Sequence, residues 1–330
     1  MKRSIYIFSN GELKRKENTL YLKTGEEKKY IPVENISEIF ILGEVTINKR
    51  LLEFLTEKGI TLHFFNYYGY YVGSFYPREH LNSGYMILKQ AEHYLDLQKR
   101  LFLAKRFVEG AVENIKKVLN YYFNRGKALQ GYIEKIRILS DSLNKCESTD
   151  ELMAIEGNIR EQYYHAFDKI LDNEHFLFEE RSRRPPKNRL NALISFANSL
   201  LYTVCLSEIY HTHLDPRIGF LHATNFRRFT LNLDVAEIFK PIIVDRCLFT
   251  LINKKIIKPH HFEKKLNGIV LNDRGKQLLI EEMEEKLKST IKYRSIGRHV
   301  SYRRLIRLEL YKIQKHLIGE EEYKPFIANW

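Results

Sequence analysis

Four residues in the chain carry the carboxylate and imidazole groups that could do chemistry together. Glu156 lies in the stretch Met-Ala-Ile-Glu-Gly, between an apolar triplet and a glycine, which predicts a partly buried carboxylate. His222 follows a segment in which a proline and a glycine predict a turn. Asp234 and Glu237 lie three residues apart in a segment of helical period, so we expect them to share one helix face.

This donor set suits a hard divalent cation if the side chains converge. Carboxylate oxygens with one imidazole and no thiolate favour Mg²⁺ or Mn²⁺ over zinc. The chain has a formal net charge of +13, and the substrate that fits such a chain is a phosphodiester. The ion would stabilise charge on the phosphoryl oxygens and activate a water or a 3′-hydroxyl. The sequence does not establish convergence, because the candidate residues lie far apart along it.

Each candidate also has a purely structural interpretation. Glu156 could be a surface glutamate that pairs with Arg160, four residues later on the same helix face. Asp234 and Glu237 could be a solvated acidic pair. His222 could be an ordinary histidine beside a turn. Pattern alone leaves these alternatives open.

Basic residues are in excess, with 54 Lys and Arg against 41 Asp and Glu, and they gather in segments that could contact DNA. Residues 181–189 are basic and include no acid, while residues 293–307 interleave arginine with tyrosine. The second pattern offers backbone charge and base stacking together. An ordinary solvated surface is the alternative for both segments. The candidate DNA contacts are Arg183, Arg184, Arg227, Arg228, Arg294, Arg298, Arg303 and Arg307.

The sequence lacks the motifs of several classes of enzyme. It contains no phosphate-binding Gly-x-x-x-x-Gly-Lys-Ser/Thr loop, no Gly-x-Gly-x-x-Gly, no His-Glu-x-x-His and no Gly-x-Ser-x-Gly. Three widely separated cysteines exclude a disulfide framework and a four-cysteine zinc site, so we expect reduced thiols and a cytoplasmic location. The uncharged run at 190–207 contains several polar residues, which favours a buried helix over a membrane span.

The apolar pattern predicts an α+β protein with a small β-rich domain followed by a larger all-α domain. The β-rich domain covers residues 1–85 and includes a linker at 78–85. Its strands are expected at 18–24, 36–42 and 60–65, with one helix over 47–58 that ends at Gly59. Since a core this small is marginal alone, packing on the helices or on a second copy of the chain would stabilise it.

The all-α domain covers residues 86–330 and must position every candidate residue. Its apolar residues recur with helical period over long segments. The expected helices cover 88–108, 112–122, 135–143, 152–171, 190–210, 231–255, 274–288 and 302–317.

Taken in order, these segments resemble the CRISPR-associated protein one family, the integrase of spacer acquisition, over nearly the whole chain. The helical part carries Glu156-Gly157 with Tyr163-Tyr164, then Arg184-Pro185-Pro186, Asp215-Pro216 leading to Gly219-Phe220-Leu221-His222, and Leu233-Asp234-Val-Ala-Glu237-Ile-Phe-Lys240-Pro241. The β-rich part carries Gly43-Glu-Val-Thr-Ile-Asn and Gly59-Ile-Thr-Leu-His-Phe-Phe.

The resemblance implies a β-sandwich-like N-terminal domain that forms a homodimer, and a helical catalytic domain. It implies that Glu156, His222 and Glu237 are catalytic and bind Mg²⁺ or Mn²⁺, with Asp234 as a further possible ligand. The implied reaction inserts prespacer DNA at the CRISPR leader–repeat junction, with CRISPR-associated protein two as partner. The alternatives are a metal-dependent nuclease of branched or repair DNA and a basic DNA-binding scaffold without catalysis.

Overall fold

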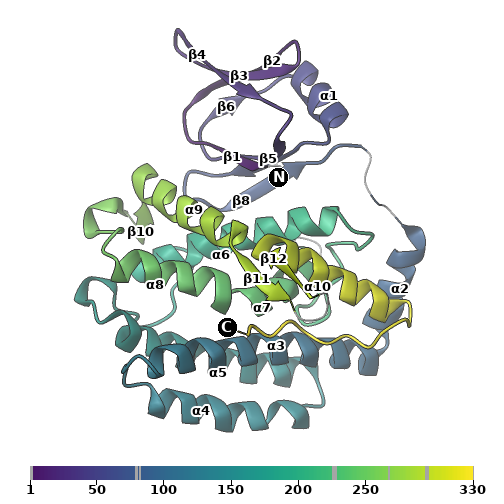
Figure 1. The fold of residues 1–330 in the computed structure, drawn as a ribbon, viewed down its shortest axis with the longest axis vertical. Helices are drawn as coiled ribbons and strands as arrows, with labels where there is room; N and C mark the ends of the chain where they lie inside the picture. The colour runs from purple at the N-terminus through teal and green to yellow at the C-terminus, as the bar shows by residue number, and fades with distance from the viewer. Residues whose placement is uncertain are drawn as a thin grey trace. The chain divides into compact units, whose positions relative to one another are not determined.

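The computed structural model of the chain describes residues 3–78, 81, 83–224, 229–266, 268–293 and 297–329. The chain divides into two compact units, Met1–Leu81 and Asn82–Trp330 (Figure 1). The first unit is rich in strands and the second is mostly helical, which confirms the expected α+β fold class. A role in dimerisation for residues 1–85 stays a prediction.

Two four-stranded sheets and one helix make up the N-terminal unit. One sheet has the strand order β1-β5-β7-β8 and the other β4-β3-β2-β6. In the first sheet β1, β5 and β7 are parallel, and β8 pairs with β7 in the antiparallel sense. The bounds are β1 Arg3–Ile7, β2 Gly11–Lys16, β3 Thr19–Thr24, β4 Glu27–Pro32, β5 Ile36–Ile41, β6 Val45–Thr46, α1 Lys49–Lys58, β7 Thr61–Phe65 and β8 Tyr71–Phe75.

Helix α1 has the ends that its sequence predicts. The side chain of Asn48 accepts a hydrogen bond from the Leu51 N–H, which caps the N-terminus. Gly59 ends the helix with a φ of 65°, a left-handed conformation that glycine adopts at little cost. Because Phe54 and Leu55 are fully buried, the helix packs on the sheets while it carries the chain from β6 to the parallel strand β7.

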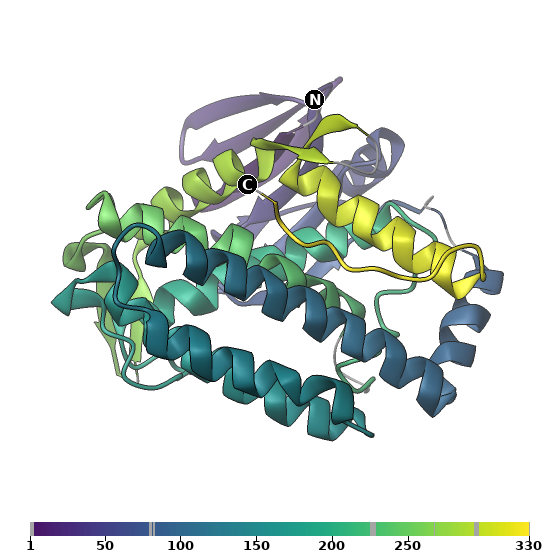
Figure 2. The same ribbon diagram turned by 60° about the horizontal axis from the view of Figure 1, so that its bottom comes forward.

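The second unit is built from long helices, of which α3, α4 and α5 lie side by side (Figure 2). Helix α7 packs against α3 and α6, in the interior of the unit. The bounds are α2 Gly84–Leu95, α3 Leu97–Phe123, α4 Gln130–Asp141, α5 Thr149–Leu171, α6 Arg189–Tyr210, α7 Leu231–Phe239, α8 Arg246–Asn253, α9 Asp273–Lys288 and α10 Tyr302–Leu317.

The helix predicted over 88–108 breaks earlier than expected, and the helix predicted over 112–122 is not separate. The break lies at Asp96, whose Oδ1 accepts hydrogen bonds from the first N–H groups of α3. Helix α3 then continues through Gly110 without interruption. A Cβ at Gly110 would lie 2.7 Å from the Pro325 side chain, so this glycine permits close packing and does not end the helix.

The prediction of a single helix over 231–255 is wrong. Helix α7 ends at Phe239, a π-helix (η3) covers Pro241–Asp245, and α8 follows. The physical reason is Pro241, which has no backbone N–H to continue the α-helical hydrogen bonds.

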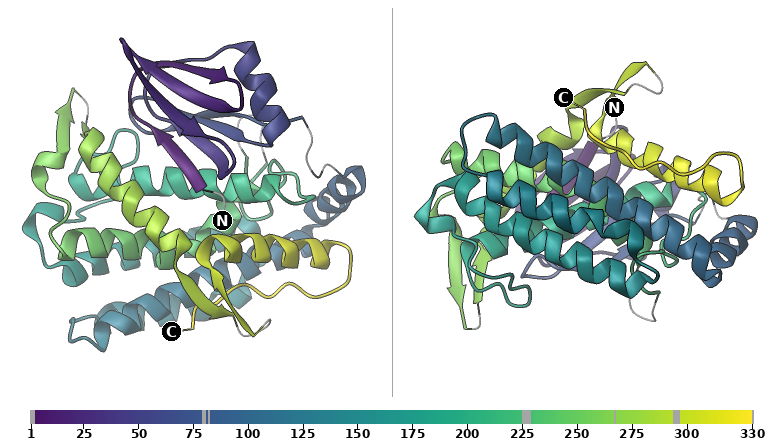
Figure 3. Two further views of the ribbon diagram at one scale, coloured as in Figure 1. Left: turned by 45° about the horizontal axis from the view of Figure 1, so that its top comes forward. Right: turned by 90° about the horizontal axis from the view of Figure 1, so that it is seen from below.

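Two small hairpins add strands that the sequence patterns did not predict. They pair β9 (Phe262–Lys265) with β10 (Gly268–Leu271), and β11 (Thr290–Tyr293) with β12 (Arg298–Ser301). Figure 3 shows both hairpins at the edges of the helical unit. Each strand has four residues, so the unit remains mostly helical.

Among the described residues, α6 is the helix that is long and apolar enough to cross a membrane, by length and composition only. However, 89% of its most apolar window is buried inside the protein. This burial is what the sequence predicts for the 190–207 run, because a core helix places polar residues such as Asn191 against protein partners.

Candidate functional site

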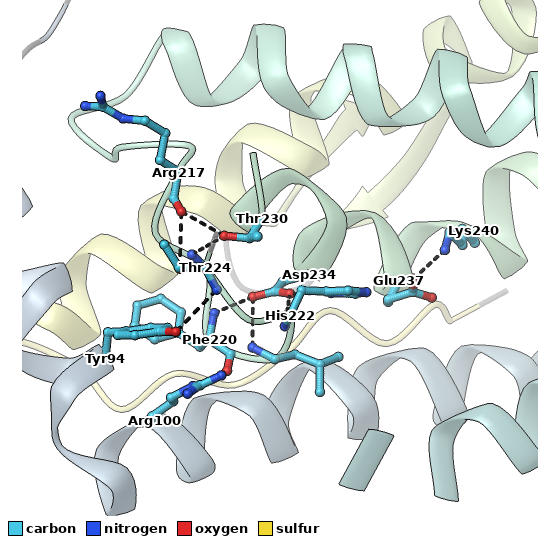
Figure 4. A network of polar contacts seen from close by, with 12 residues as sticks. Tyr94, Arg100, Arg217, Phe220, His222, Thr224, Thr230, Asp234, Glu237 and Lys240 are labelled. Atoms are coloured by element: carbon cyan, nitrogen blue, oxygen red, sulfur yellow. Dashed lines mark hydrogen bonds and ion pairs between the residues drawn. The ribbon is translucent and has the colours of Figure 1, made fainter. Parts of the chain in front are cut away.

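Asp234 fastens the loop that carries His222 to the first turn of α7 (Figure 4). Its Oδ2 accepts hydrogen bonds from the backbone N–H groups of Phe220 at 2.6 Å and Leu221 at 3.0 Å. Its Oδ1 accepts from the His222 N–H at 3.0 Å and lies 2.7 Å from the Nδ1 of the same residue. The carboxylate is fully buried, so these contacts replace the water that it loses.

The rest of the loop is held equally closely. Gln90 of α2 donates to the carbonyls of Asp215 and Ile218 and accepts from the Asp215 N–H. Gly219 passes so near α7 that a Cβ there would lie 2.7 Å from Oδ2 of Asp234. Glycine is therefore required at this position by close approach, and the loop holds His222 in a defined place.

The same contacts determine which nitrogen of His222 is available. An ionised carboxylate only accepts hydrogen bonds, so Nδ1 carries the proton toward Asp234 and Nε2 keeps the lone pair of the neutral ring. Burial lowers the pKa of His222, but the hydrogen bond and charge of Asp234, with the charge of Glu237, together raise it above its usual value. In Figure 4 the ring lies between the carboxylates of Asp234 and Glu237.

Arg160 joins the two predicted site glutamates. Its Nη2 lies 2.5 Å from Oε2 of Glu237 and 3.3 Å from Oε1 of Glu156. The pairing with Arg160 that was the structural alternative for Glu156 is present, and it is part of a larger cluster that links α5 to α7. The Glu156 side chain keeps 21% of its surface exposed, against 7% for Glu237, so Glu156 lies at the solvent side of the cluster.

Glu237 is buried between two cations. Lys240 donates to its Oε1 from one turn further along, and Arg160 contacts its Oε2. Burial alone would raise the pKa of Glu237, but the charges of Lys240 and Arg160 outweigh it and lower the pKa to about 2. The alternative of a solvated acidic pair is wrong, because Asp234 and Glu237 are both buried.

A further acid, which the sequence analysis did not single out as a site residue, interacts electrostatically with Arg160. Asp245, in the π-helix, is 1% exposed, and burial raises its pKa to about 7 against the opposing charge of Arg160. Tyr163, on α5, is fully buried close enough to Asp245 for that charge to raise its pKa further. The spacing of Tyr163 and Arg160 on one helix was visible in the sequence, but their approach to Asp245 depends on the π-helix.

The donor types fit a divalent cation. One nitrogen of Arg160 lies within reach of oxygens from both Glu156 and Glu237, so these oxygens already converge on a point of positive charge. His222 offers Nε2 on the side of Glu237, and its charge and that of Glu237 influence each other (Figure 4). Within the described ranges no three acid, histidine or cysteine side chains form a ready-made ion site, so Arg160 would have to withdraw.

The predicted DNA-contact arginines fall into three groups. Arg183, Arg184 and Arg298 are at least partly exposed. Arg303 and Arg307, on α10, bind Glu208 of α6 at 2.8 and 2.6 Å, and Glu208 is only 2% exposed. These two arginines therefore stabilise helix packing, and their contact with DNA stays a prediction. The remaining three lie outside the described residues: Arg227, Arg228 and Arg294.

Comparison with known proteins gives consistent matches. The profile of the family described as CRISPR associated protein Cas1 matches residues 5–285. A protein of Thermodesulfovibrio yellowstonii named CRISPR-associated endonuclease Cas1 2 is 74% identical over 330 residues, covering 100% of both chains. The CRISPR-associated endonuclease Cas1 of Thermotoga maritima is 51% identical over 320 residues, covering 97% of this chain and 98% of that one.

Solved structures agree on the fold. A Cas1 protein from Thermotoga maritima superimposes with a TM-score of 0.87 at 50% identity, covering 98% of this chain and 99% of that chain. A casposase bound to integration product has a TM-score of 0.89 at 21% identity, covering 99% and 94%, which shows a shared fold alone. With the family profile and the full-length relatives, these matches establish that the chain belongs to the CRISPR-associated protein Cas1 family.

Proposed function

We propose that this chain is a metal-dependent DNA integrase and endonuclease of CRISPR adaptation. The observation that carries the proposal is the convergence of Glu156 and Glu237 on one positive centre beside an oriented His222, in a member of the Cas1 family. The names of the relatives, which are called CRISPR-associated endonucleases, support the same activity.

The proposed reaction is a transesterification of DNA. The 3′-hydroxyl of a prespacer attacks a phosphodiester at the CRISPR leader–repeat junction and forms a new phosphorus–oxygen bond. The displaced oxygen leaves as the 3′-hydroxyl of the cut target strand, so the number of phosphodiester bonds is conserved. When water replaces the attacking hydroxyl, the same displacement is endonuclease cleavage.

In this proposal Glu156, Glu237 and the Nε2 atom of His222 bind Mg²⁺ or Mn²⁺. A bound ion would stabilise charge at the phosphoryl oxygens and would lower the pKa of the attacking hydroxyl or water. Asp234 is a positioning residue, because its buried oxygens are all used by the loop and the His222 ring. Lys240 keeps Glu237 ionised, as the lowered pKa of that carboxyl indicates.

The proposed partners are double-stranded DNA, a second copy of the chain bound through residues 1–85, and CRISPR-associated protein two. The net charge of +13 supports a DNA partner. A Cas6-RT-Cas1–Cas2 complex contains a chain of the same fold, with a TM-score of 0.85 at 17% identity. That complex also contains Cas2, the protein partner that we propose here. We expect the assembly to act in the cytoplasm.

An integration assay with Glu156→Ala tests the proposal. The purified protein, with and without the small partner, is incubated with a duplex that has free 3′ ends and with a supercoiled CRISPR plasmid. We expect joined product with Mg²⁺ or Mn²⁺ and none with EDTA. Glu156→Ala should abolish joining and leave DNA binding intact, since the side chain is partly exposed and its contact within the described fold is with Arg160.

The alternatives give different results in the same assay. Cleavage without joining, with the partner present, would favour a nuclease of branched or repair DNA. DNA binding with neither product under any metal would favour a non-catalytic scaffold. A Glu156→Ala protein that integrates as well as the parent would contradict the assignment of the site.

A further inference from the structure

Three buried polar atoms make no hydrogen bond of good geometry within the described part of the chain, although the Tyr163 hydroxyl is near enough to the Asp245 carboxyl to interact with it. They are Nη1 of Arg160, the hydroxyl of Tyr163 and Oδ2 of Asp245. The charges of Asp245 and Arg160 act on each other, and Asp245 acts on Tyr163. Since an unsatisfied buried polar group is costly, the free nitrogen of Arg160 and the free oxygen of Asp245 favour a contact between these two residues that the present arrangement does not make.

The charges around the glutamates already balance. Glu156 and Glu237 carry two negative charges, and Arg160 and Lys240 carry two positive ones within contact distance. A divalent cation would add two more positive charges in a space that is largely closed to water. Binding of the ion is therefore favourable only if a resident cation leaves the carboxylates.

Arg160 is the cation that can leave. It bridges both glutamates, so it occupies the oxygens that an ion would need. Lys240 contacts only Oε1 of Glu237 and also lies over the Tyr202 ring, 5.0 Å from its centroid. An arginine that turns away from the glutamates has the carboxyl of Asp245 within electrostatic reach as a second partner.

We propose that Arg160 is a cationic placeholder: it bridges Glu156 and Glu237 before a divalent cation binds, then turns its guanidinium toward Asp245. The placeholder prevents repulsion between two carboxylates that must stay close together. Asp245 is the residue that receives it, and the hydroxyl of Tyr163 interacts with the same carboxyl. This inference rests on the proposed metal-dependent function, and it makes Arg160 and Asp245 positioning residues.

Mn²⁺ binding by the full-length chain tests the placeholder, because it can be measured without activity. Titration calorimetry gives the affinity, and thermal unfolding in EDTA gives the stability without metal. Arg160→Gln should bind Mn²⁺ about tenfold more tightly, because the competing charge is gone, and should unfold at a lower temperature in EDTA. Asp245→Asn should bind Mn²⁺ about tenfold more weakly without losing stability in EDTA, because the arginine has no charge to move to.

These opposite shifts separate a placeholder from a merely structural arginine. Equal or weaker Mn²⁺ binding by Arg160→Gln would overturn the inference, as would unchanged binding by Asp245→Asn. If Arg160→Gln does not fold, Asp245→Asn decides alone. Arg160→Lys is the control that keeps the charge, and it should not gain the full affinity of Arg160→Gln.

Failure of the proposed function has a different signature. If the parent binds no Mn²⁺, or binds it equally well without the Glu156 side chain, the assignment of the metal site is wrong. The placeholder role of Arg160 is then overturned as well. If the parent binds Mn²⁺ at Glu156 but the Arg160 and Asp245 variants behave like the parent, only the placeholder is overturned.

Discussion

The two halves of the site are held in place by different means. The His222 half depends on main-chain contacts, since three consecutive N–H groups donate to Asp234 and the loop passes too close to α7 for a side chain at Gly219. The glutamate half depends on ion pairs between side chains, with Arg160 between Glu156 and Glu237. A main-chain anchor fixes a ligand, whereas an ion-pair cluster can exchange one cation for another.

The largest effect should follow removal of the main-chain anchor. Asp234→Ala leaves three backbone N–H groups and the His222 ring without their acceptor in a buried place. We expect a loss of about 3–5 kcal/mol in unfolding free energy, which urea unfolding measures. Glu156→Ala is the matched control in the other half and should change stability by less than about 1 kcal/mol. Equal losses in the two variants would contradict the contrast between the halves.

The next effect concerns the ionisation of Asp245, whose carboxyl interacts with Arg160, and its size depends on pH. While Arg160 contacts the two glutamates, the folded protein raises the pKa of Asp245 from 3.8 to about 7, so the neutral carboxyl is favoured in the protein without metal. The stability that this provides is complete below about pH 4 and is lost as the pH rises to about 7. Asp245→Asn cannot ionise, so its stability relative to the parent should increase by about 2–4 kcal/mol between pH 4 and pH 8.

Urea unfolding of both proteins at several pH values measures this difference. Asp141→Asn, at a side chain on α4 that is 69% exposed, is the control and should follow the parent at every pH. If the unfolding free energies of Asp245→Asn and the parent differ by the same amount at every pH, Asp245 is ionised throughout this range. Its carboxylate would then have a stronger charged partner than the contacts described here.

A second buried glutamate tests the same comparison, because Glu208 of α6 also lies between two cations, Arg303 and Arg307, which both come from α10. Arg303→Ala removes one partner of Glu208 and leaves Arg307 in contact. We expect a loss of about 1–2 kcal/mol in unfolding free energy. Arg304→Ala, at the exposed neighbouring position, is the control and should cost less than about 0.5 kcal/mol.

The same variant tests the predicted DNA contact. If Arg303 also reaches phosphate, Arg303→Ala weakens DNA binding equally for different sequences and reduces the dependence of affinity on salt. Binding is measured below the unfolding temperature, so that lost packing does not mimic a lost contact. An unchanged salt slope would show that Arg303 acts only through Glu208.

Periodicity in the sequence predicted most of the helices and the strands at β3, β5 and β7, because one buried face repeats at a fixed interval. It also placed Asp234 and Glu237 on one helix face, but it left their burial open. Burial depends on which helix lies opposite, and the arginine that neutralises Glu237 comes from α5. Spacing did indicate one cation, since Arg160 is four residues after Glu156. Lys240, three residues after Glu237, was not singled out, although its spacing allows the ion pair that the structure shows.

Two features of the site could not be predicted from the sequence, for physical reasons. Asp234 holds main-chain groups of Phe220 and Leu221, and a backbone donor has no residue type that a pattern could reveal. Asp245 lies in a segment that the prediction took as regular helix, and the sequence analysis gave its side chain no role. The π-helix after Pro241 changes the angular position of the residues that follow and places the carboxyl where its charge acts on Arg160.

The smallest expected effect on stability concerns the surface beside Glu156. Gly157 is exposed in the interior of α5, and a Cβ there would meet nothing within 4 Å. The fold therefore does not need this glycine, and Gly157→Ala should stabilise the protein by about 0.5–1 kcal/mol, as measured by urea unfolding. If the glycine is instead needed for DNA to approach Glu156 closely, the same variant should lower the rate of joining while stability rises. Gly219→Ala is the contrasting variant, because its Cβ would collide with Asp234, and it should lose both stability and joining. A Gly157→Ala protein that joins DNA at the parental rate would place the DNA backbone away from this turn of α5.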